Sequence, residues 1–246
     1  MAESKLSSLS IFFPFYNEEG NVEKMIASAY EVGLKFTNDL EVIALHGGPS
    51  KDGTFKKILE MKEKFPQLKI VDKRDNTEGY AVIKYGFAAC SKEFVFYTDG
   101  DAQYRLEDDF PKLVNKYKET GADVVNGYKK DRRYGFLRDF LSKSYAVLAR
   151  FFFQLPIRDV DCDFRLIRKS VMDKIVLESG NASILPEMIK KLELAGARFA
   201  EVYVNHYERE YGKSSYTAFT LLKEKLIGDV KLFFKMRKLL KTYPKK

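Results

Sequence analysis

The 246-residue chain has no tryptophan and only two cysteines, Cys90 and Cys162. Two isolated cysteines make no disulfide framework, so we expect a reducing compartment. No run of about 18 apolar residues occurs, so we expect no membrane-spanning helix. The first residues lack the basic and apolar regions of a signal peptide. Because no repeat, low-complexity segment or Pro/Gly-rich linker marks a boundary, we expect a single domain over residues 1–246.

The charge is unbalanced in the positive direction. Lys and Arg number 43 against 35 Asp and Glu, which gives a formal net charge of +8. A positive surface favours anionic partners such as phosphates, nucleic acid or acidic lipids. We recognise no nucleic-acid-binding module in the sequence and expect no nucleic-acid partner. With 45% hydrophobic and 32% charged residues, the chain is typical of a folded globular protein.

Short apolar runs alternate with helical patterns in the first half. This alternation predicts βα units that build a mostly parallel sheet flanked by helices. The expected strands are Leu9–Phe15, Leu40–Leu45, Leu68–Val71, Phe94–Thr98 and Ala122–Gly127. The expected helices are Glu19–Phe36, Thr54–Lys64, Glu78–Cys90 and Leu106–Glu119.

The second half is less regular. We expect helices over Tyr134–Phe153 and Pro186–Leu194, strands over Cys162–Ile167 and Arg198–His206, and a basic amphipathic helix over Tyr216–Lys241.

Ligands of an open parallel α/β sheet bind beyond the carboxyl ends of its strands. Polar loops follow each of the first four expected strands, and we expect them to meet at one edge. Asp99-Gly100-Asp101 is the sharpest of these features, because it directly follows an apolar strand. Two carboxylates one residue apart can hold Mg²⁺ or Mn²⁺, and Gly100 permits a tight backbone there. An ordinary Asp-Gly turn with solvated acids is the alternative.

Several motifs together resemble family 2 glycosyltransferases, which have the GT-A fold. Pro14 with Tyr16-Asn17-Glu18-Glu19 resembles the family's opening motif, and residues 99–103 resemble its D-x-D-x-Q motif. The segments around Arg138, 159–165 and 206–215 are similar to the branch of dolichol-phosphate mannose synthase and other polyprenyl-phosphate glycosyltransferases. The resemblance covers residues 9–216. It implies a nucleotide-sugar half over about 1–125, an acceptor half over 126–216 and an appended helix over 217–246.

The resemblance implies a role for each matching residue. The residues expected to bind the nucleotide-sugar are Pro14, Tyr16, Glu18, His46, Asp99, Arg209 and Ser214, and those expected to bind the metal are Asp99 and Asp101. The acceptor phosphate is expected to be bound by Arg132, Arg133, Arg138 and Ser142. The residues expected to act in catalysis are Asp101, Gln103 and Arg138. Guanidinium groups suit the phosphate sites because their planar forks match phosphate oxygens.

The reaction implied is inverting, metal-dependent transfer of a sugar from GDP-mannose or a UDP-hexose to a polyprenyl or dolichyl phosphate. A phosphate monoester is already ionised, so this transfer needs no general base. Mg²⁺ or Mn²⁺ would neutralise the departing diphosphate. The sugar, the base, the lipid length and the oligomeric state are not readable from the sequence.

The second loop departs from the family pattern. Asp52-Gly53-Thr54 matches, but His46-Gly47-Gly48 replaces an acidic pair of which one acid normally contacts the base. His46 either bonds the base instead or has no role there. Asp163 stands where the family commonly has glycine, and we assign it no function. His206 is a candidate for a phosphate contact, a base or a structural group.

Two other functions remain open. A soluble transferase acting on a sugar hydroxyl would need a base, for which Asp159, Asp161 and Glu187 are the candidates. An inactive nucleotide-sugar-binding scaffold would explain the altered second loop. The absence of tryptophan excludes the usual Gln-x-x-Arg-Trp motif of processive polysaccharide synthases.

Apolar stripes in residues 136–153 and the basic helix after residue 216 suggest contact with an anionic membrane. We therefore expect a cytoplasmic protein that is peripheral on the cytoplasmic face of a membrane. Packing of the same stripes into the core is the ordinary alternative.

Overall fold

A computed structural model describes residues 5–129, 150–151, 153–212, 228–230 and 232–234. Its strands are β1 (Leu9–Phe15), β2 (Leu40–His46), β3 (Lys69–Asp72), β4 (Phe94–Thr98), β5 (Val124–Tyr128), β6 (Phe164–Arg168) and β7 (Phe199–Tyr203). Its helices are α1 (Glu19–Phe36), α2 (Thr54–Lys64), α3 (Ile83–Ala89), α4 (Leu106–Thr120), α6 (Lys169–Met172) and α7 (Ile184–Leu194), with a 3₁₀ turn at Gly79–Val82.

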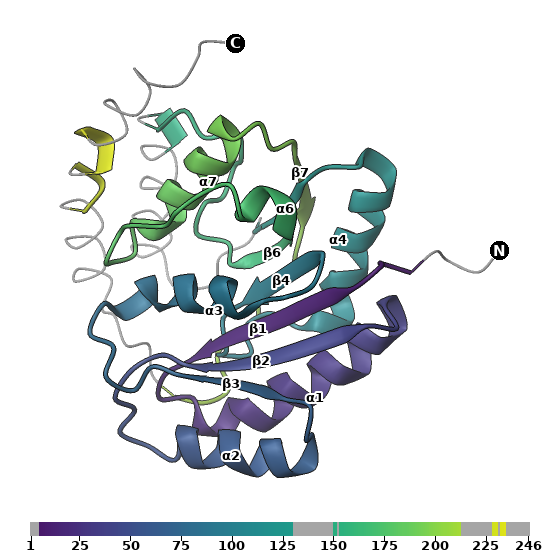
Figure 1. Ribbon diagram of the computed structural model, residues 1–246, viewed down its shortest axis with the longest axis vertical. Coiled ribbons are helices and arrows are strands. Elements are labelled where there is room, and N and C mark those ends of the chain that lie inside the picture. Colours follow the sequence, from purple (N-terminus) through teal and green to yellow (C-terminus); the bar gives the residue numbers. More distant parts are fainter. Residues whose placement is uncertain (1–4, 130–149, 152, 213–227, 231, 235–246) are drawn as a thin grey trace.

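The strands form one mixed sheet in the order β3-β2-β1-β4-β6-β5-β7 (Figure 1). Strand β6 runs antiparallel to β4 and β5, whereas the other neighbouring pairs are parallel. This confirms the predicted mostly parallel α/β sheet. Strand β1 has β2 on one side and β4 on the other, so the strand order reverses between β1 and β4. A crevice for ligands is expected at such a switch point.

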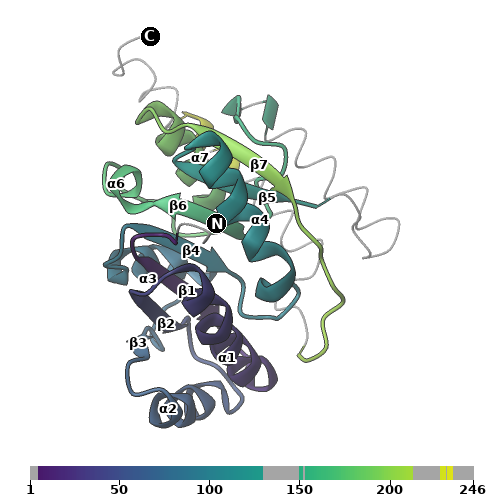
Figure 2. The ribbon, with the colours of Figure 1, turned by 90° about the vertical axis from the view of Figure 1, so that its right-hand side faces the viewer.

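Helices pack on both faces of the sheet (Figure 2), and a buried apolar cluster lies on each face. On one face, Met25 of α1, Ile58 of α2 and Leu113 of α4 belong to the same buried cluster. On the other face, Phe87 of α3 and Met188 of α7 belong to a second cluster. The inner strands are therefore buried on both sides, which explains why sequences such as those of β1, β2 and β4 read as nearly continuous apolar runs.

The predicted elements of the first half are present with small changes at their ends. The helix expected over Glu78–Cys90 is divided into the 3₁₀ turn and α3. Strand β2 extends to His46, so this residue ends a strand rather than beginning a loop. In the second half, α7 begins two residues before Pro186, and β7 is shorter than the expected Arg198–His206.

The two long helices expected over Tyr134–Phe153 and Tyr216–Lys241 lie mostly outside the described residues. Within them, residues 150–151, 153, 228–230 and 232–234 are helical. No helix in the described part of the chain is long and apolar enough to cross a bilayer.

A buried carboxylate ties the strands together at the edge where β1 and β2 begin. Glu41 of β2 accepts hydrogen bonds from the Ser10 hydroxyl (2.6 Å), the Ser91 hydroxyl (2.7 Å), the Ser91 amide (2.9 Å) and Lys69. Burial would raise the pKa of Glu41, but these hydrogen bonds outweigh it and lower the pKa to about 2. The carboxylate is thus a structural anion of the sheet.

Glu41→Gln should lower the free energy of unfolding by about 2 kcal/mol at neutral pH. The folded-state pKa lies below the ordinary value of 4.5, so the stabilisation is present above that pH and is lost as the pH falls towards about 2. Urea unfolding at neutral and acid pH tests this. Glu31→Gln, which removes an exposed pair with Lys35, is the control and should change stability by less than about 1 kcal/mol. A difference between wild type and Glu41→Gln that does not shrink at acid pH would contradict the assignment.

Candidate active site

The carboxyl ends of six strands share one edge of the sheet. The parallel register places Phe15 of β1 opposite His46 of β2, and His46 opposite Asp72 of β3. Since β6 is antiparallel to both of its neighbours, β5 and β7 end at the same edge as β4. The predicted meeting of polar loops is confirmed.

Hydrogen bonds join the loop after β1 to the loop after β2. The Glu18 amide donates to the Thr54 hydroxyl (2.8 Å), and the Lys51 amide donates to the Asn17 side-chain oxygen (2.7 Å). Asn17 has a φ of 55°, a left-handed conformation that asparagine adopts more readily than most residues. These contacts fix Glu18 beyond the carboxyl end of β1.

The Asp99-Gly100-Asp101 segment follows β4 and packs tightly on β1. A Cβ atom on Gly100 would lie 2.5 Å from the Phe15 ring and 2.7 Å from the Pro14 carbonyl oxygen. Gly100 is therefore required by close packing rather than by a positive φ. Ala102 does have a positive φ, of 57°, which is strained for alanine and lies next to Asp101.

Arg209 bridges two acids that come from distant parts of the chain. Its Nη1 lies 2.5 Å from Glu18 Oε1, and its Nη2 lies 2.6 Å from Asp101 Oδ2. Arg209 follows β7, Glu18 follows β1 and Asp101 follows β4. The predicted nucleotide residues Glu18 and Arg209 and the predicted metal ligand Asp101 thus lie together.

The segment that carries Arg209 is docked on the loop after β4. The Tyr207 amide donates to the Gln103 carbonyl oxygen (2.8 Å), and Gln103 Nε2 donates to the Tyr207 carbonyl oxygen (3.0 Å). The Gln103 side chain therefore holds this segment, in addition to its predicted catalytic role. His206 packs its ring edge-to-face against Tyr104, with centroids 5.1 Å apart.

The acids at this edge are hard to ionise together. Burial raises the pKa of Glu18 to about 7, although Arg209 and Asn21 oppose the shift. Burial, together with the charges of Asp163 and Asp101, raises the pKa of Asp99. Burial also raises the pKa of Asp101, against the effect of Arg209. A cation placed among these groups would favour their ionised forms.

A buried network lies behind Asp99. The Tyr80 hydroxyl donates to Asp99 Oδ1 (2.8 Å). Arg165 is fully buried, and its Nη1 donates to Asp163 Oδ1 (2.9 Å) and to the Tyr97 hydroxyl. The Tyr97 hydroxyl donates to the same Asp163 oxygen (3.0 Å).

Sequence reasoning assigned no role to Tyr80, Tyr97, Asp163 or Arg165. An arginine inside the apolar run of β6 was a usable signal, because a buried charge requires partners. Nothing in the sequence pointed to Tyr80, whose contact depends on how the turn before α3 is placed.

His46 is buried, with 2% of its surface exposed. Its Nε2 lies 3.0 Å from the Ser50 hydroxyl, and its ring stacks on Phe55 with centroids 5.1 Å apart. Burial lowers the pKa of His46, although Asp72 opposes the shift, so the ring is neutral at neutral pH. These contacts favour a structural role in the second loop over the predicted contact with the base.

Two other predicted residues lie at the same edge. Pro14 and Tyr16 are half-buried, and Tyr16 packs against Gly48 of the second loop. The remaining predicted residues, Arg132, Arg133, Arg138, Ser142 and Ser214, lie outside the described residues. Cys90 and Cys162 are buried free thiols, consistent with the expected absence of disulfides among the described residues.

The acids fit a divalent cation in chemistry. Asp99 and Asp101 supply the carboxylate oxygens that Mg²⁺ and Mn²⁺ prefer. The described part of the chain contains no cluster of three or more acidic, histidine or cysteine side chains able to hold a metal by themselves. Mg²⁺ commonly uses one or two carboxylates and completes its shell with water and substrate phosphates, so two protein ligands are sufficient.

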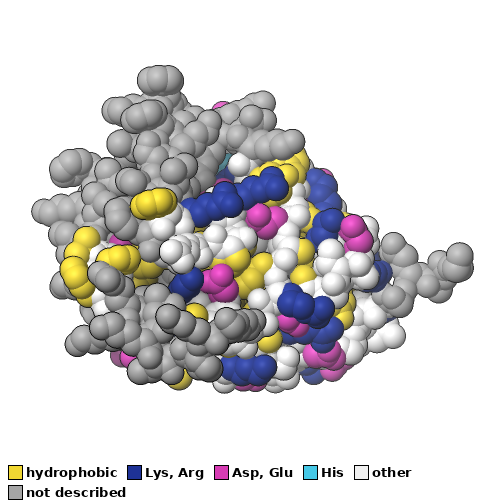
Figure 3. Space-filling model, turned by 90° about the horizontal axis from the view of Figure 1, so that it is seen from above, with side chains coloured by type: hydrophobic (Ala, Val, Ile, Leu, Met, Phe, Trp, Pro, Cys, Tyr) yellow, Lys and Arg dark blue, Asp and Glu magenta, His cyan; other side chains and the backbone are white. Residues whose placement is uncertain are grey.

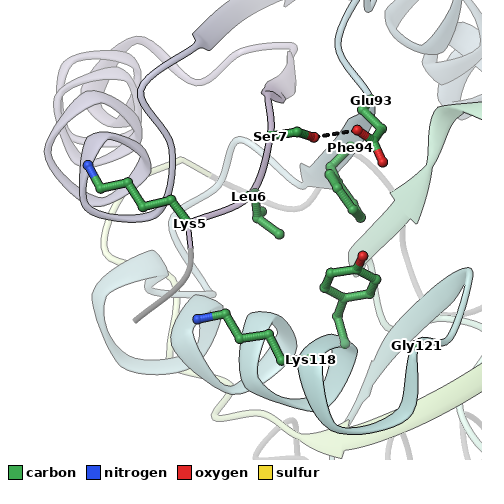
Figure 4. Close-up of a pocket in the computed structure, with 8 residues that line it drawn as sticks. Lys5, Leu6, Ser7, Glu93, Phe94, Lys118 and Gly121 are labelled. Atoms are coloured by element: carbon green, nitrogen blue, oxygen red, sulfur yellow. Dashed lines mark hydrogen bonds between the residues drawn. The ribbon is translucent and has the colours of Figure 1, made fainter. Parts of the chain in front are cut away.

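A cavity of about 410 Å³ lies at the opposite edge of the sheet (Figure 4). Its lining includes Lys5, Ser7, Glu93 and Lys118, near the starts of β1 and β4 and the end of α4. This places it away from Asp99 and Asp101, and it has no part in the site.

Residues 10–176 match the family described as glycosyl transferase family 2. The chain belongs to this family. The match includes Glu18, Asp99 and Asp101 but ends before Arg209.

Curated relatives cover most of this chain. An undecaprenyl-phosphate 4-deoxy-4-formamido-L-arabinose transferase of Pseudomonas fluorescens is 25% identical over 87% of the chain and 62% of the relative. The chain thus spans less than two thirds of that relative's length. An uncharacterised protein of Methanocaldococcus jannaschii is 29% identical over 78% of the chain and 85% of the relative.

Among solved structures, glucosyl-3-phosphoglycerate synthase from Mycobacterium tuberculosis, in complex with Mn²⁺, UDP and glucosyl-3-phosphoglycerate, has a TM-score of 0.66. The two sequences are 14% identical, and the superposition covers 92% of the chain described here and 79% of the synthase. This likeness confirms the GT-A fold predicted from the motifs.

Gly100→Ala should reduce the free energy of unfolding by about 1–3 kcal/mol, because the added Cβ overlaps the Phe15 ring and the Pro14 carbonyl oxygen. Thermal or urea unfolding measures the change. Gly180→Ala is the matched control, since its Cβ would meet only Glu78 Oε1 at 3.5 Å. Equal stabilities for the two variants would show that the segment after β4 is not packed as described.

Proposed function

We propose that this chain transfers a sugar from a nucleotide-sugar to a polyprenyl phosphate, with inversion and with the help of Mg²⁺ or Mn²⁺. The convergence of Asp99, Asp101, Glu18 and Arg209 at the switch point of a family 2 domain carries this proposal. GDP-mannose and UDP-hexoses are the candidate donors.

The polyprenyl phosphate acceptor is supported by the Pseudomonas fluorescens relative, which is named as an undecaprenyl-phosphate transferase. A bound metal is supported by the acids at the crevice and by the Mn²⁺ and UDP in the glucosyl-3-phosphoglycerate synthase structure. Asp99 and Asp101 would hold the cation, which would offset the charge of the departing diphosphate. Arg209 would face the diphosphate, Glu18 would line the nucleotide pocket, and Gln103 would position the segment that carries Arg209.

The candidate bases also bear on the choice of acceptor. Glu187 is fully buried, and its oxygens accept hydrogen bonds from the amides of Glu178 (3.0 Å) and Ser179 (2.8 Å) and from Lys191 (2.6 Å). Asp159 is 4% exposed, and Asp161 is half-buried. Glu187 is held by groups of the protein itself, which removes one of the three candidate bases and supports an acceptor that arrives already ionised.

Asp99→Asn and Asp101→Asn should each reduce turnover by about a hundredfold or more, since each removes charge from the proposed cation site. The assay is a panel of GDP-mannose, UDP-glucose and UDP-N-acetylglucosamine with a short polyprenyl phosphate, with and without Mn²⁺ or Mg²⁺. Asp173→Asn, which removes an exposed pair with Lys169, is the matched control and should keep full turnover. Full turnover in both site variants would refute the proposal, and binding of donor without any transfer or hydrolysis would favour the scaffold.

Contact with a membrane is supported by exposed apolar side chains beside the undescribed segments (Figure 3). Phe151 is 77% exposed, Phe234 63% and Val230 57%. With the net charge of +8, such side chains suit a peripheral position on an anionic bilayer.

The protein should sediment with anionic vesicles at low salt and be released at high salt, because the attraction is partly electrostatic. Replacing Phe151 and Phe234 by serine should weaken sedimentation. Replacing the exposed Val176 by serine is the control, since Val176 precedes α7 and lies outside these helical segments. Retention of the doubly substituted protein on vesicles at wild-type levels would contradict this surface.

A further inference from the structure

Arg209 lies between two acidic side chains of the candidate site. Its two Nη atoms contact Glu18 and Asp101, and no more than about a fifth of its side chain is exposed. The second oxygen of Asp101 accepts the Gln103 amide (3.1 Å). Both oxygens of Asp101 are thus engaged by groups of the protein itself.

We propose that Arg209 is an exchangeable counter-ion of Asp101. In the donor-free molecule the guanidinium occupies the position that a divalent cation takes when the nucleotide-sugar binds, and it then moves to the diphosphate. The inference rests on the proposed function and adds an order to it: the cation enters with the nucleotide rather than before it.

The backbone around Arg209 allows this exchange without unfolding the segment. Tyr207 remains paired with Gln103 through two hydrogen bonds, and Glu210 pairs at the surface with Lys24 (3.1 Å) and Arg105 (3.5 Å). Arg209 lies between these anchors. Reorientation of its side chain alone would therefore free Asp101.

Negative charge is offset in both states, and Arg209 alone does not cancel it. In the donor-free state the single positive charge of Arg209 is shared between Glu18 and Asp101. In the loaded state the cation compensates the carboxylates, and the fork of Arg209 matches the oxygens of a diphosphate. A cation that arrives alone must displace Arg209, which then has no anion to receive it, so binding of metal without nucleotide is weak.

The test is a titration with Mn²⁺ followed by electron paramagnetic resonance of the free ion, with Mn²⁺ alone and with UDP or GDP present. Wild-type protein should bind Mn²⁺ weakly alone and much more tightly with nucleotide. Arg209→Gln should bind Mn²⁺ alone about tenfold more tightly than wild type, because the competing charge is gone. The gain on adding nucleotide should shrink by a similar factor.

Two further variants make the result specific. Arg209→Lys keeps the charge and should give an affinity for Mn²⁺ alone between those of wild type and Arg209→Gln. Arg74→Gln removes the same charge, but Arg74 pairs with Asp72 rather than Asp101 and does not contact the segment that carries Arg209, so this variant should match wild type.

Weaker or unchanged binding of Mn²⁺ alone in folded Arg209→Gln would overturn the inference while leaving the proposed function intact, as would an equal gain in Arg74→Gln. Failure of wild-type protein to bind Mn²⁺ with either nucleotide would overturn both. Circular dichroism of each variant confirms that the folded protein is being compared.

Discussion

Buried negative charge at the crevice between β1 and β4 is the constraint on which the rest of the site depends. Glu18, Asp101 and Asp163 are each less than a tenth exposed, and Asp99 lies among them. Such charges are costly unless they are paired. The fold meets the cost in two different ways. Arg165 is fixed beneath the site by four partners inside the core, whereas Arg209 reaches the site from a surface segment. The pairing of Arg165 is therefore permanent, whereas the pairing of Arg209 is the part that a ligand can rearrange.

The position of this crevice follows from the topology of the sheet. The chain leaves β1 towards β2 on one side and returns to β4 on the other, so β1 and β4 are the neighbouring strands at which the order reverses. Beyond their carboxyl ends, Gly100 packs directly on Pro14 and Phe15. The acids after β4 are thereby held close to Glu18 after β1. The packing of Gly100 and the order of the strands thus position the same few residues, as expected of a site placed on a rigid scaffold.

Much of this arrangement was predictable from local patterns. Apolar runs identified the strands, and parallel pairing alone placed the loops after β1 to β4 at one edge. The contacts made by side chains were not predictable in this way. Arg209 and Glu18 are separated by 191 positions in the chain, and no periodicity specifies their pairing. His46 was expected in a loop, but β2 continues through it, and the ring is consequently buried. The pairing of Tyr80 with Asp99 depends on the turn that replaces the first part of the expected helix.

The direction of β5 bears on where an acceptor phosphate would be bound. Both guanidinium groups in the described site are already committed, Arg165 to the core and Arg209 to Glu18 and Asp101. Lys129 lies close enough to influence both aspartates of the motif, and its ammonium donates to the Asp161 carbonyl oxygen (3.1 Å). Because β5 runs in the same direction as β4, the chain passes Lys129 at the edge that carries Asp99. Arg132 and Arg133, which we predict to bind the acceptor phosphate, follow Lys129 within four residues in the sequence. An acceptor phosphate would need positive charge that the donor has not already used, and the ammonium of Lys129 is such a charge beside the acids of the site.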